Sequence, residues 1–256
     1  MRFEKYQAAG NDFIIINGFE KKIILAESQI VNLCNRHFGV GADGLIIIER
    51  TEKADFYMDF YNSDGSKASM CGNGARCAVK SFYHNFYSDK EMKFLTDDGL
   101  HYAKILDEEV VISMADVVEI KKYKDGCFLN TGVPHFVTIV EKISEINVNI
   151  EGRKYADDIR FAPSRTNVDF VEIRDGIFNI STYERGVEAE TLSCGTGVVA
   201  TAIAMSFLDK NENNNIQIKA KRGSFKVSFN RFENTFSNIK LFGEAKFVFF
   251  GEIIIL

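Results

Sequence analysis

The sequence predicts an α+β (α/β) protein built from two similar, pseudo-symmetric domains, each a curled β-sheet around a central helix. Two observations predict this fold. The turn Cys-Gly-x-Gly occurs twice, at residues 71–74 and 194–197, and a small, apolar, helix-forming run follows each copy. The rest of the chain consists mostly of short runs of β-forming residues between turns. Many strands with one principal helix per half are typical of α+β domains.

The two turns belong to a longer repeat. Fifty-eight positions separate Phe13 from Cys71, and the same number separates Phe136 from Cys194. The residues around Phe13 also resemble those around Phe136. This period is far longer than that of solenoid repeats, so it indicates two like domains. We expect the two domains to face each other and to bring both turns to one cleft.

In the first half, the run at 26–37 has helical spacing of its apolar residues, and the principal helix follows Cys71. Strands are expected at 13–16, 45–48 and 56–61, and again between 92 and 114. In the second half, strands are expected at 136–140, 168–173, up to Tyr183, 216–220, 225–229 and 238–242. The apolar tail from 247 to 256 is too short to span a membrane, so we expect a buried final strand.

Composition excludes several classes of function. The chain has 256 residues and a formal net charge of −5, which gives no electrostatic reason to expect nucleic acid or an anionic membrane as a partner. Its five cysteines are an odd number and do not form a secreted disulfide framework. The first residues lack the apolar core of a signal peptide. We therefore expect a cytoplasmic protein with no metal site.

Each Cys-Gly-x-Gly turn predicts an anion site. The first N–H groups of a helix have no partner within the helix, and together with the helix dipole they favour a carboxylate. The same field favours a thiolate, so we expect a lowered pKa for Cys71 and Cys194. Inverting an amino acid Cα needs a base on one face and an acid on the other, and two opposed thiols suit both roles. This arrangement requires no cofactor.

The chain resembles the diaminopimelate epimerase family, which is cofactor-independent and interconverts LL- and meso-diaminopimelate. The resemblance covers nearly the whole length and rests on several motifs together. These are residues 9–13, 39–44, 62–66, 70–77, 132–135, 165–168, 183–186 and 190–197.

The resemblance implies roles for individual residues. Cys71 and Cys194 would be the thiolate and thiol pair, with His135 and Glu184 tuning their protonation. The carboxylate at the reacting centre would be held by Gly72, Asn73, Gly195 and Thr196. The remaining substrate contacts would come from Asn11, Asn62, Asn167, Glu184 and Arg185. Arg185 offers a bidentate fork for a second carboxylate at the distal end.

We also expect a domain division and an assembly. The first domain would span 1–117 and be completed by the C-terminal strand, 245–256. The second would span 118–244, with the active site in the cleft between the two domains. The expected partner is a small amino acid substrate, and the expected assembly is a homodimer.

Two positions depart from the family pattern. Many members carry glutamine where this chain has Gly44, and asparagine where it has Val133. The departures leave open a related racemase or epimerase for lanthionine, histidine or another amino acid. A proline or hydroxyproline racemase-like enzyme is a third hypothesis. A metabolite-binding or thiol redox protein is the non-enzymatic alternative.

Overall fold

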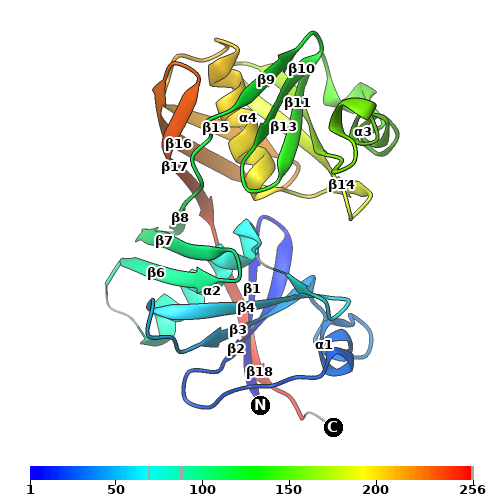
Figure 1. Ribbon diagram of the computed structural model, residues 1–256. Helices are drawn as coiled ribbons and strands as arrows, with labels where there is room; N and C mark the ends of the chain where they lie inside the picture. Colours follow the sequence, from blue (N-terminus) through cyan, green and yellow to red (C-terminus); the bar gives the residue numbers. More distant parts are fainter. Residues whose placement is uncertain (69, 87–88, 255–256) are drawn as a thin grey trace. The chain divides into compact units, whose positions relative to one another are not determined.

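A computed structural model describes residues 1–68, 70–86 and 89–254 (Figure 1). The chain divides into two compact units. Unit 1 comprises 1–112 and 243–256, and unit 2 comprises 113–242. The final positions 255 and 256 of the expected C-terminal strand lie outside the described residues. No described helix has both the length and the apolar composition needed to cross a membrane.

The described residues of unit 1 form two helices and nine strands. The helices are α1 (Glu27–Cys34) and α2 (Gly72–Phe86). The strands are β1 (Arg2–Ala8), β2 (Asn11–Asn17), β3 (Gly44–Glu49), β4 (Phe56–Asn62), β5 (Lys67–Ala68), β6 (Glu91–Thr96), β7 (Gly99–Leu106), β8 (Glu109–Ser113) and β18 (Lys246–Glu252). Their pairing gives the order β18-β1-β2-β3-β4-β6-β7-β8, with β5 beside the end of β4. The pairs β2–β3 and β4–β6 are parallel.

Unit 2 repeats this order. Its helices are α3 (Val148–Ala156) and α4 (Gly195–Phe207), and short 3-10 turns lie at Ile143–Glu145 and Ile159–Phe161. The strands are β9 (Ile120–Tyr123), β10 (Gly126–Asn130), β11 (Pro134–Val140), β12 (Asn167–Arg174), β13 (Ile177–Glu184), β14 (Ala189–Thr191), β15 (Asn215–Ala220), β16 (Ser224–Phe232) and β17 (Thr235–Glu244). The order is β9-β10-β11-β12-β13-β15-β16-β17, with β14 beside β13. The expected pseudo-symmetric α+β fold is confirmed.

The strands form two repeats, β1 to β9 and β10 to β18. The last strand of each repeat belongs to the other unit. Strand β9 follows β8 in the chain, yet it pairs with β10 of unit 2. Strand β18 follows β17, yet it pairs with β1 of unit 1. The two strands therefore occupy equivalent places, beside β10 and beside β1, and each repeat contributes one strand to the fold of the other.

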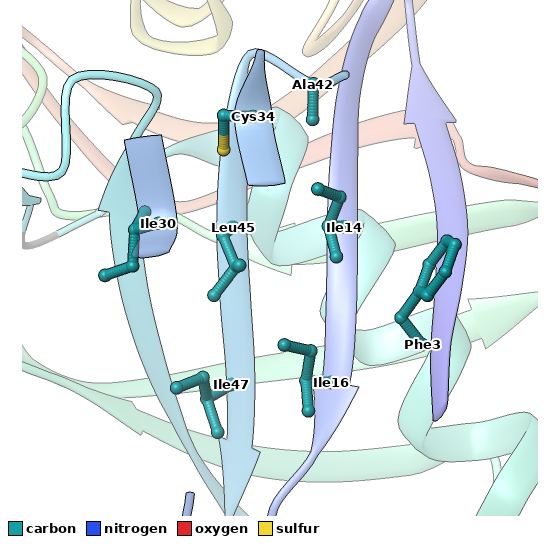
Figure 2. Close-up of a cluster of buried hydrophobic side chains, with 8 residues drawn as sticks. All are labelled: Phe3, Ile14, Ile16, Ile30, Cys34, Ala42, Leu45 and Ile47. Carbon is teal, nitrogen blue, oxygen red and sulfur yellow. The ribbon is translucent and has the colours of Figure 1, made fainter. Parts of the chain in front are cut away.

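Buried isoleucines on both faces of β2 and β3 explain the three layers of unit 1. Ile14 and Leu45 point to the face that α1 covers, where Ile30 and Cys34 complete a buried cluster (Figure 2). Alternate residues such as Ile46 point to the opposite face, which packs against α2. When helices cover both faces of a parallel strand pair, successive side chains are all buried, so the sequence of each strand is a continuous apolar run.

Helix α4 is buried nearly all round, which fits its run of small and apolar residues. Among its buried polar residues is Thr201, whose Oγ1 has no hydrogen-bond partner in the part of the chain that the structure describes. Burying an unpaired hydroxyl costs free energy. Replacing this hydroxyl by an apolar group of the same size should therefore stabilise the folded protein.

We expect Thr201→Val to raise the free energy of unfolding by about 1 kcal/mol, because valine keeps the shape and removes the unpaired hydroxyl. Urea denaturation of the wild-type protein and the variant measures the difference. A loss of stability would show that the hydroxyl has a partner in solution.

The expectation of a buried final strand is wrong. Four consecutive side chains of β18, from Phe247 to Phe250, are exposed, and Phe250 keeps 61% of its surface accessible. The physical reason is that, among the described strands, β18 pairs with β1 on one side and lies at the edge of the unit 1 sheet. Phe249 packs edge-on against Phe3 across that pair, with ring centroids 5.9 Å apart.

Candidate active site

In unit 1, the site residues gather where α2 begins. Cys71 immediately precedes the helix, and its carbonyl accepts the first intrahelical bond, from the N–H of Ala75 at 2.7 Å. The Sγ of Cys71 lies 3.7 Å from Oδ1 of Asn11. The side-chain nitrogen of Asn73 lies 3.5 Å from the same oxygen. Three of the expected residues therefore meet at one point, on β2 and at the start of α2.

Charged groups hold the two asparagines in place. Asp43 accepts a hydrogen bond from the side-chain nitrogen of Asn11 at 2.7 Å, which turns Oδ1 of Asn11 toward Cys71. Arg76, which is fully buried, donates to Oδ1 of Asn73 at 2.5 Å. Burial lowers the pKa of Arg76. Neither Asp43 nor Arg76 was among the expected site residues, although both lie inside the motifs that carry the family resemblance.

In unit 2, the site residues gather where α4 begins. Cys194 is the residue before the helix, and its Sγ lies 3.3 Å from Oγ1 of Thr196. That hydroxyl lies 2.9 Å from Nε2 of His135, which is fully buried on β11. The side-chain nitrogen of Asn167 approaches the same Nε2 at 3.4 Å. Four expected residues therefore form one connected group.

Glu184 is the last residue of β13 and Arg185 follows it, and both lie at the border of this group. The carboxylate of Glu184 accepts a hydrogen bond from the hydroxyl of Thr191 at 2.6 Å. The backbone N–H of Arg185 donates to Oδ1 of Asn167 at 3.0 Å. The guanidinium of Arg185 donates to the carbonyl oxygen of Ser164 and, at 3.5 Å, to that of Arg165. Two backbone carbonyls thus accept hydrogen bonds from Nη1 of Arg185.

The expectation that Cys194 has a lowered pKa is wrong. Burial raises the pKa of its thiol well above the ordinary value, and the nearby charges of Glu184 and Asp169 raise it further. The hydrogen bond between the sulfur and Oγ1 of Thr196, and the one from the backbone N–H of Gly197, lower the pKa, but burial and the two charges outweigh them. The field of the helix start favours a thiolate, but desolvation of the buried thiol opposes it more strongly.

Asn62 does not join either group through a hydrogen bond that the structure describes. It is exposed at the end of β4, where its side-chain nitrogen donates to Oγ of Ser66 at 3.1 Å. Gly44 pairs with Asn62 across the sheet. A Cβ at position 44 would lie 2.7 Å from the carbonyl oxygen of Tyr61 and 2.8 Å from the ring of Phe60. The neighbouring strand therefore leaves little room for a side chain at position 44.

Sequence reasoning missed Asp169. This residue is fully buried on β12, and its Oδ2 lies 2.7 Å from Nδ1 of His135. The signal that could have found it is an aspartate inside an otherwise apolar strand, Val168 to Val171. A charge in such a place needs a specific partner.

Solved structures share this fold at low sequence identity. A PhzF-family phenazine biosynthesis protein from Bacillus anthracis matches with a TM-score of 0.79 at 12% identity, over 100% of this chain and 99% of that chain. A probable proline racemase from Agrobacterium radiobacter matches with a TM-score of 0.71 at 13% identity, over 99% and 93% of the two chains. The chain therefore shares its fold with both of these proteins.

Sequence comparisons give the family among proteins of this fold. The model of diaminopimelate epimerase matches residues 3–120 and 127–248. A diaminopimelate epimerase from Flavobacterium psychrophilum is 43% identical over 97% of this chain and 98% of its own length. One from Campylobacter lari is 43% identical over 86% and 88%. The chain belongs to the diaminopimelate epimerase family, a family of isomerases, as the sequence motifs indicated.

Proposed function

We propose that this protein interconverts LL- and meso-diaminopimelate at Cα without a cofactor, as a step in lysine and peptidoglycan precursor biosynthesis in the cytoplasm. The observation that carries the proposal is a pair of cysteines, each immediately before the central helix of its unit, in a chain 43% identical to named epimerases. In this mechanism Cys71 and Cys194 lie on opposite faces of the substrate, in a cleft between the units. One thiolate removes the α-proton, and the other thiol returns a proton to the opposite face.

The helix starts supply the electrostatic part of the proposed mechanism. The amides at Gly72, Asn73, Gly195 and Thr196 occupy the positive ends of α2 and α4, where an α-carboxylate is favoured. Negative charge that spreads onto the carboxylate during deprotonation is stabilised there. His135 and Glu184 set the protonation of Cys194, since the charge of Glu184 acts on that thiol.

The remaining residues are proposed to bind the distal amino acid end. Arg185 would exchange its carbonyl partners for the bidentate contact with a second carboxylate. Asn167 is already oriented by the N–H of Arg185, and Asn62 and Asn11 supply amide groups from unit 1. A substrate with one carboxylate leaves the Arg185 fork without this contact, which favours diaminopimelate over histidine or proline.

Proton NMR in D2O tests the proposal directly. We expect the α-hydrogen signal of LL-diaminopimelate to disappear with enzyme and reductant and without added cofactor, because the proton that returns comes from solvent deuterium. Lanthionine, L-histidine and L-proline serve as parallel substrates, and the double variant C71A/C194A serves as the control. Exchange only with one of the other amino acids would reassign the substrate. No exchange with any of them would favour a binding or redox protein.

We also propose that the protein forms a homodimer, in which two copies of the chain pair along the edge of β18. The strand is self-complementary when it is paired antiparallel about Phe249. Lys246 of one copy then lies opposite Glu252 of the other, and Val248 lies opposite Phe250. The same pairing covers the exposed apolar side chains of β18.

We expect a dimer by light scattering, and we expect Val248→Asp to shift it to monomer because each dimer would then bury two aspartates against phenylalanine. Ile24→Asp is the matched control, since Ile24 is 80% exposed on the segment that precedes α1. A wild-type protein that stays monomeric at high concentration would refute this assembly.

A further inference from the structure

We propose that Asp169, His135 and Thr196 form a proton relay that accepts the thiol proton of Cys194 and later returns it. The inference rests on the proposed role of Cys194 as a base, and it adds a function for Asp169 and for the hydroxyl of Thr196. All four residues belong to unit 2, so the relay is complete within one unit.

Three consecutive contacts connect the relay. Sγ of Cys194 lies 3.3 Å from Oγ1 of Thr196. Oγ1 of Thr196 lies 2.9 Å from Nε2 of His135. Nδ1 of His135 lies 2.7 Å from Oδ2 of Asp169. Each distance joins two groups that can share a proton, so the path from sulfur to carboxylate has no gap.

The chemistry of the groups gives the path a direction. A carboxylate only accepts hydrogen bonds, so Nδ1 of His135 carries the proton that it donates to Asp169. In the neutral imidazole Nε2 is then an acceptor. The side chain of Asn167 supports this assignment, because its oxygen is occupied by the N–H of Arg185 and its nitrogen faces Nε2 at 3.4 Å. The hydroxyl of Thr196 therefore donates to Nε2, and its oxygen is left to accept from the thiol.

The protein provides a specific place for the Asp169 carboxylate. Oδ1 accepts a hydrogen bond from the hydroxyl of Thr182 at 2.6 Å, so both oxygens have partners. A Cβ at Gly197 would lie 2.5 Å from Oδ1, and only glycine allows the start of α4 to approach so closely. The positive end of the helix favours the charge there. The carboxylate is fully buried, has two hydrogen-bond partners and lies against the start of α4, so the surrounding structure fixes its position.

The proposed proton transfer from Cys194 to His135 conserves atoms and charge. The S–H bond of Cys194 breaks, and its proton goes to Oγ1 of Thr196 while the hydroxyl proton moves to Nε2 of His135. The products are a thiolate, a hydroxyl that now donates to the sulfur, and an imidazolium that Asp169 stabilises. The reverse transfer restores the thiol. A thiolate and imidazolium pair is a known way to activate a cysteine.

The imidazolium of His135 would offset the negative charges around Cys194, which oppose its thiolate. Glu184 at the end of β13 and Asp169 on β12 both oppose a thiolate, and burial opposes it more strongly. On β10, Cys127 faces Asp169, and burial raises the pKa of that thiol to about 12, so it stays protonated near neutral pH. An imidazolium at His135 on β11 places a positive charge next to the hydroxyl that contacts the sulfur. Asp169 acts through His135 and is a positioning residue.

Ultraviolet absorbance of the thiolate as a function of pH tests the relay without any substrate. The titration of C71A/C194A is subtracted from that of C71A, so that the signal of Cys194 alone is obtained. Burial keeps most of the Cys194 thiol protonated, and we expect the imidazolium of His135 to allow a small thiolate fraction that is still measurable near neutral pH. Thr196→Val in the C71A background should lower that fraction about tenfold, the effect of losing one hydrogen bond to a charged group, and Thr196→Ser should restore it. Thr201→Val, on the same helix, is the matched control and should leave the titration unchanged.

Asp169→Asn separates the relay from a simple field effect. The charge of Asp169 by itself raises the pKa of Cys194, so a field effect alone predicts a more acidic thiol in the variant. The relay predicts the opposite, because the imidazolium loses its counter-charge and Nδ1 can now face a donor. A more acidic thiol in Asp169→Asn, or an unchanged titration in Thr196→Val, would overturn the relay. Absence of α-proton exchange with an intact titration would reject the epimerase function and leave the relay standing.

Discussion

Replacing either Cys71 or Cys194 by alanine is expected to reduce the rate of LL to meso conversion by roughly 10²–10⁴-fold, the usual contribution of a general acid or base. Each thiol serves one face of the α-carbon in the proposed mechanism. A single variant therefore keeps a group that can exchange the α-proton of one isomer but cannot return a proton to the opposite face. We expect each variant to exchange only one of the two isomers with D2O, and the preferred isomer to differ between the variants.

The measurement combines a stereospecific assay of conversion with NMR exchange on both isomers. Cys77→Ala is the matched control, because Cys77 lies inside α2 with its side chain fully buried. Burial raises the pKa of its thiol, so it offers no base near neutral pH. If both single variants exchanged the same isomer, the two thiols could not serve opposite faces.

Oxidation is expected to remove all activity. The five cysteines, each within the described residues, are thiols. If Cys71 and Cys194 serve opposite faces of one α-carbon, as proposed, we expect an oxidant to link their sulfurs in a disulfide. We expect diamide to abolish α-proton exchange, dithiothreitol to restore it, and mass spectrometry to identify one peptide pair linked through these two residues.

The variants C71S and C194S provide the control, since neither can form the bond. Cys34 and Cys127 are not expected to compete, because burial raises their pKa values to about 11 and about 12. An oxidised protein that keeps full activity, or that links other cysteines, would contradict the proposed juxtaposition of the two thiols.

Much of the fold follows from periodicity and spacing. The repeat predicted from Phe13, Cys71, Phe136 and Cys194 places β2 and β11 at equivalent positions, and α2 and α4 likewise. Each helix begins directly after its cysteine, as the Cys-Gly-x-Gly turns indicated. The turns predicted the helix starts because a glycine turn and the apolar run after it determine the backbone conformation within a few residues.

Properties that depend on distant neighbours were not predictable in the same way. The exposure of β18 depends on which strand lies beside it, and its apolar sequence alone suggested a buried position. The pKa of Cys194 depends on burial and on carboxylates from two other strands. The partnership of Asp169 with His135 joins residues 34 positions apart through the parallel pair β11–β12. A spacing pattern carries no information about such contacts.

The exchange of last strands between repeats has a consequence for synthesis on the ribosome. Unit 2 is contiguous in the chain, so every residue that it needs has been made once position 242 is reached. Unit 1 begins first, but β1 must wait for β18, which is translated roughly 10–50 s later at ordinary elongation rates. The half that is made first is therefore finished last, and a transcript truncated near its 3′ end yields a protein whose first strand has an unpaired edge.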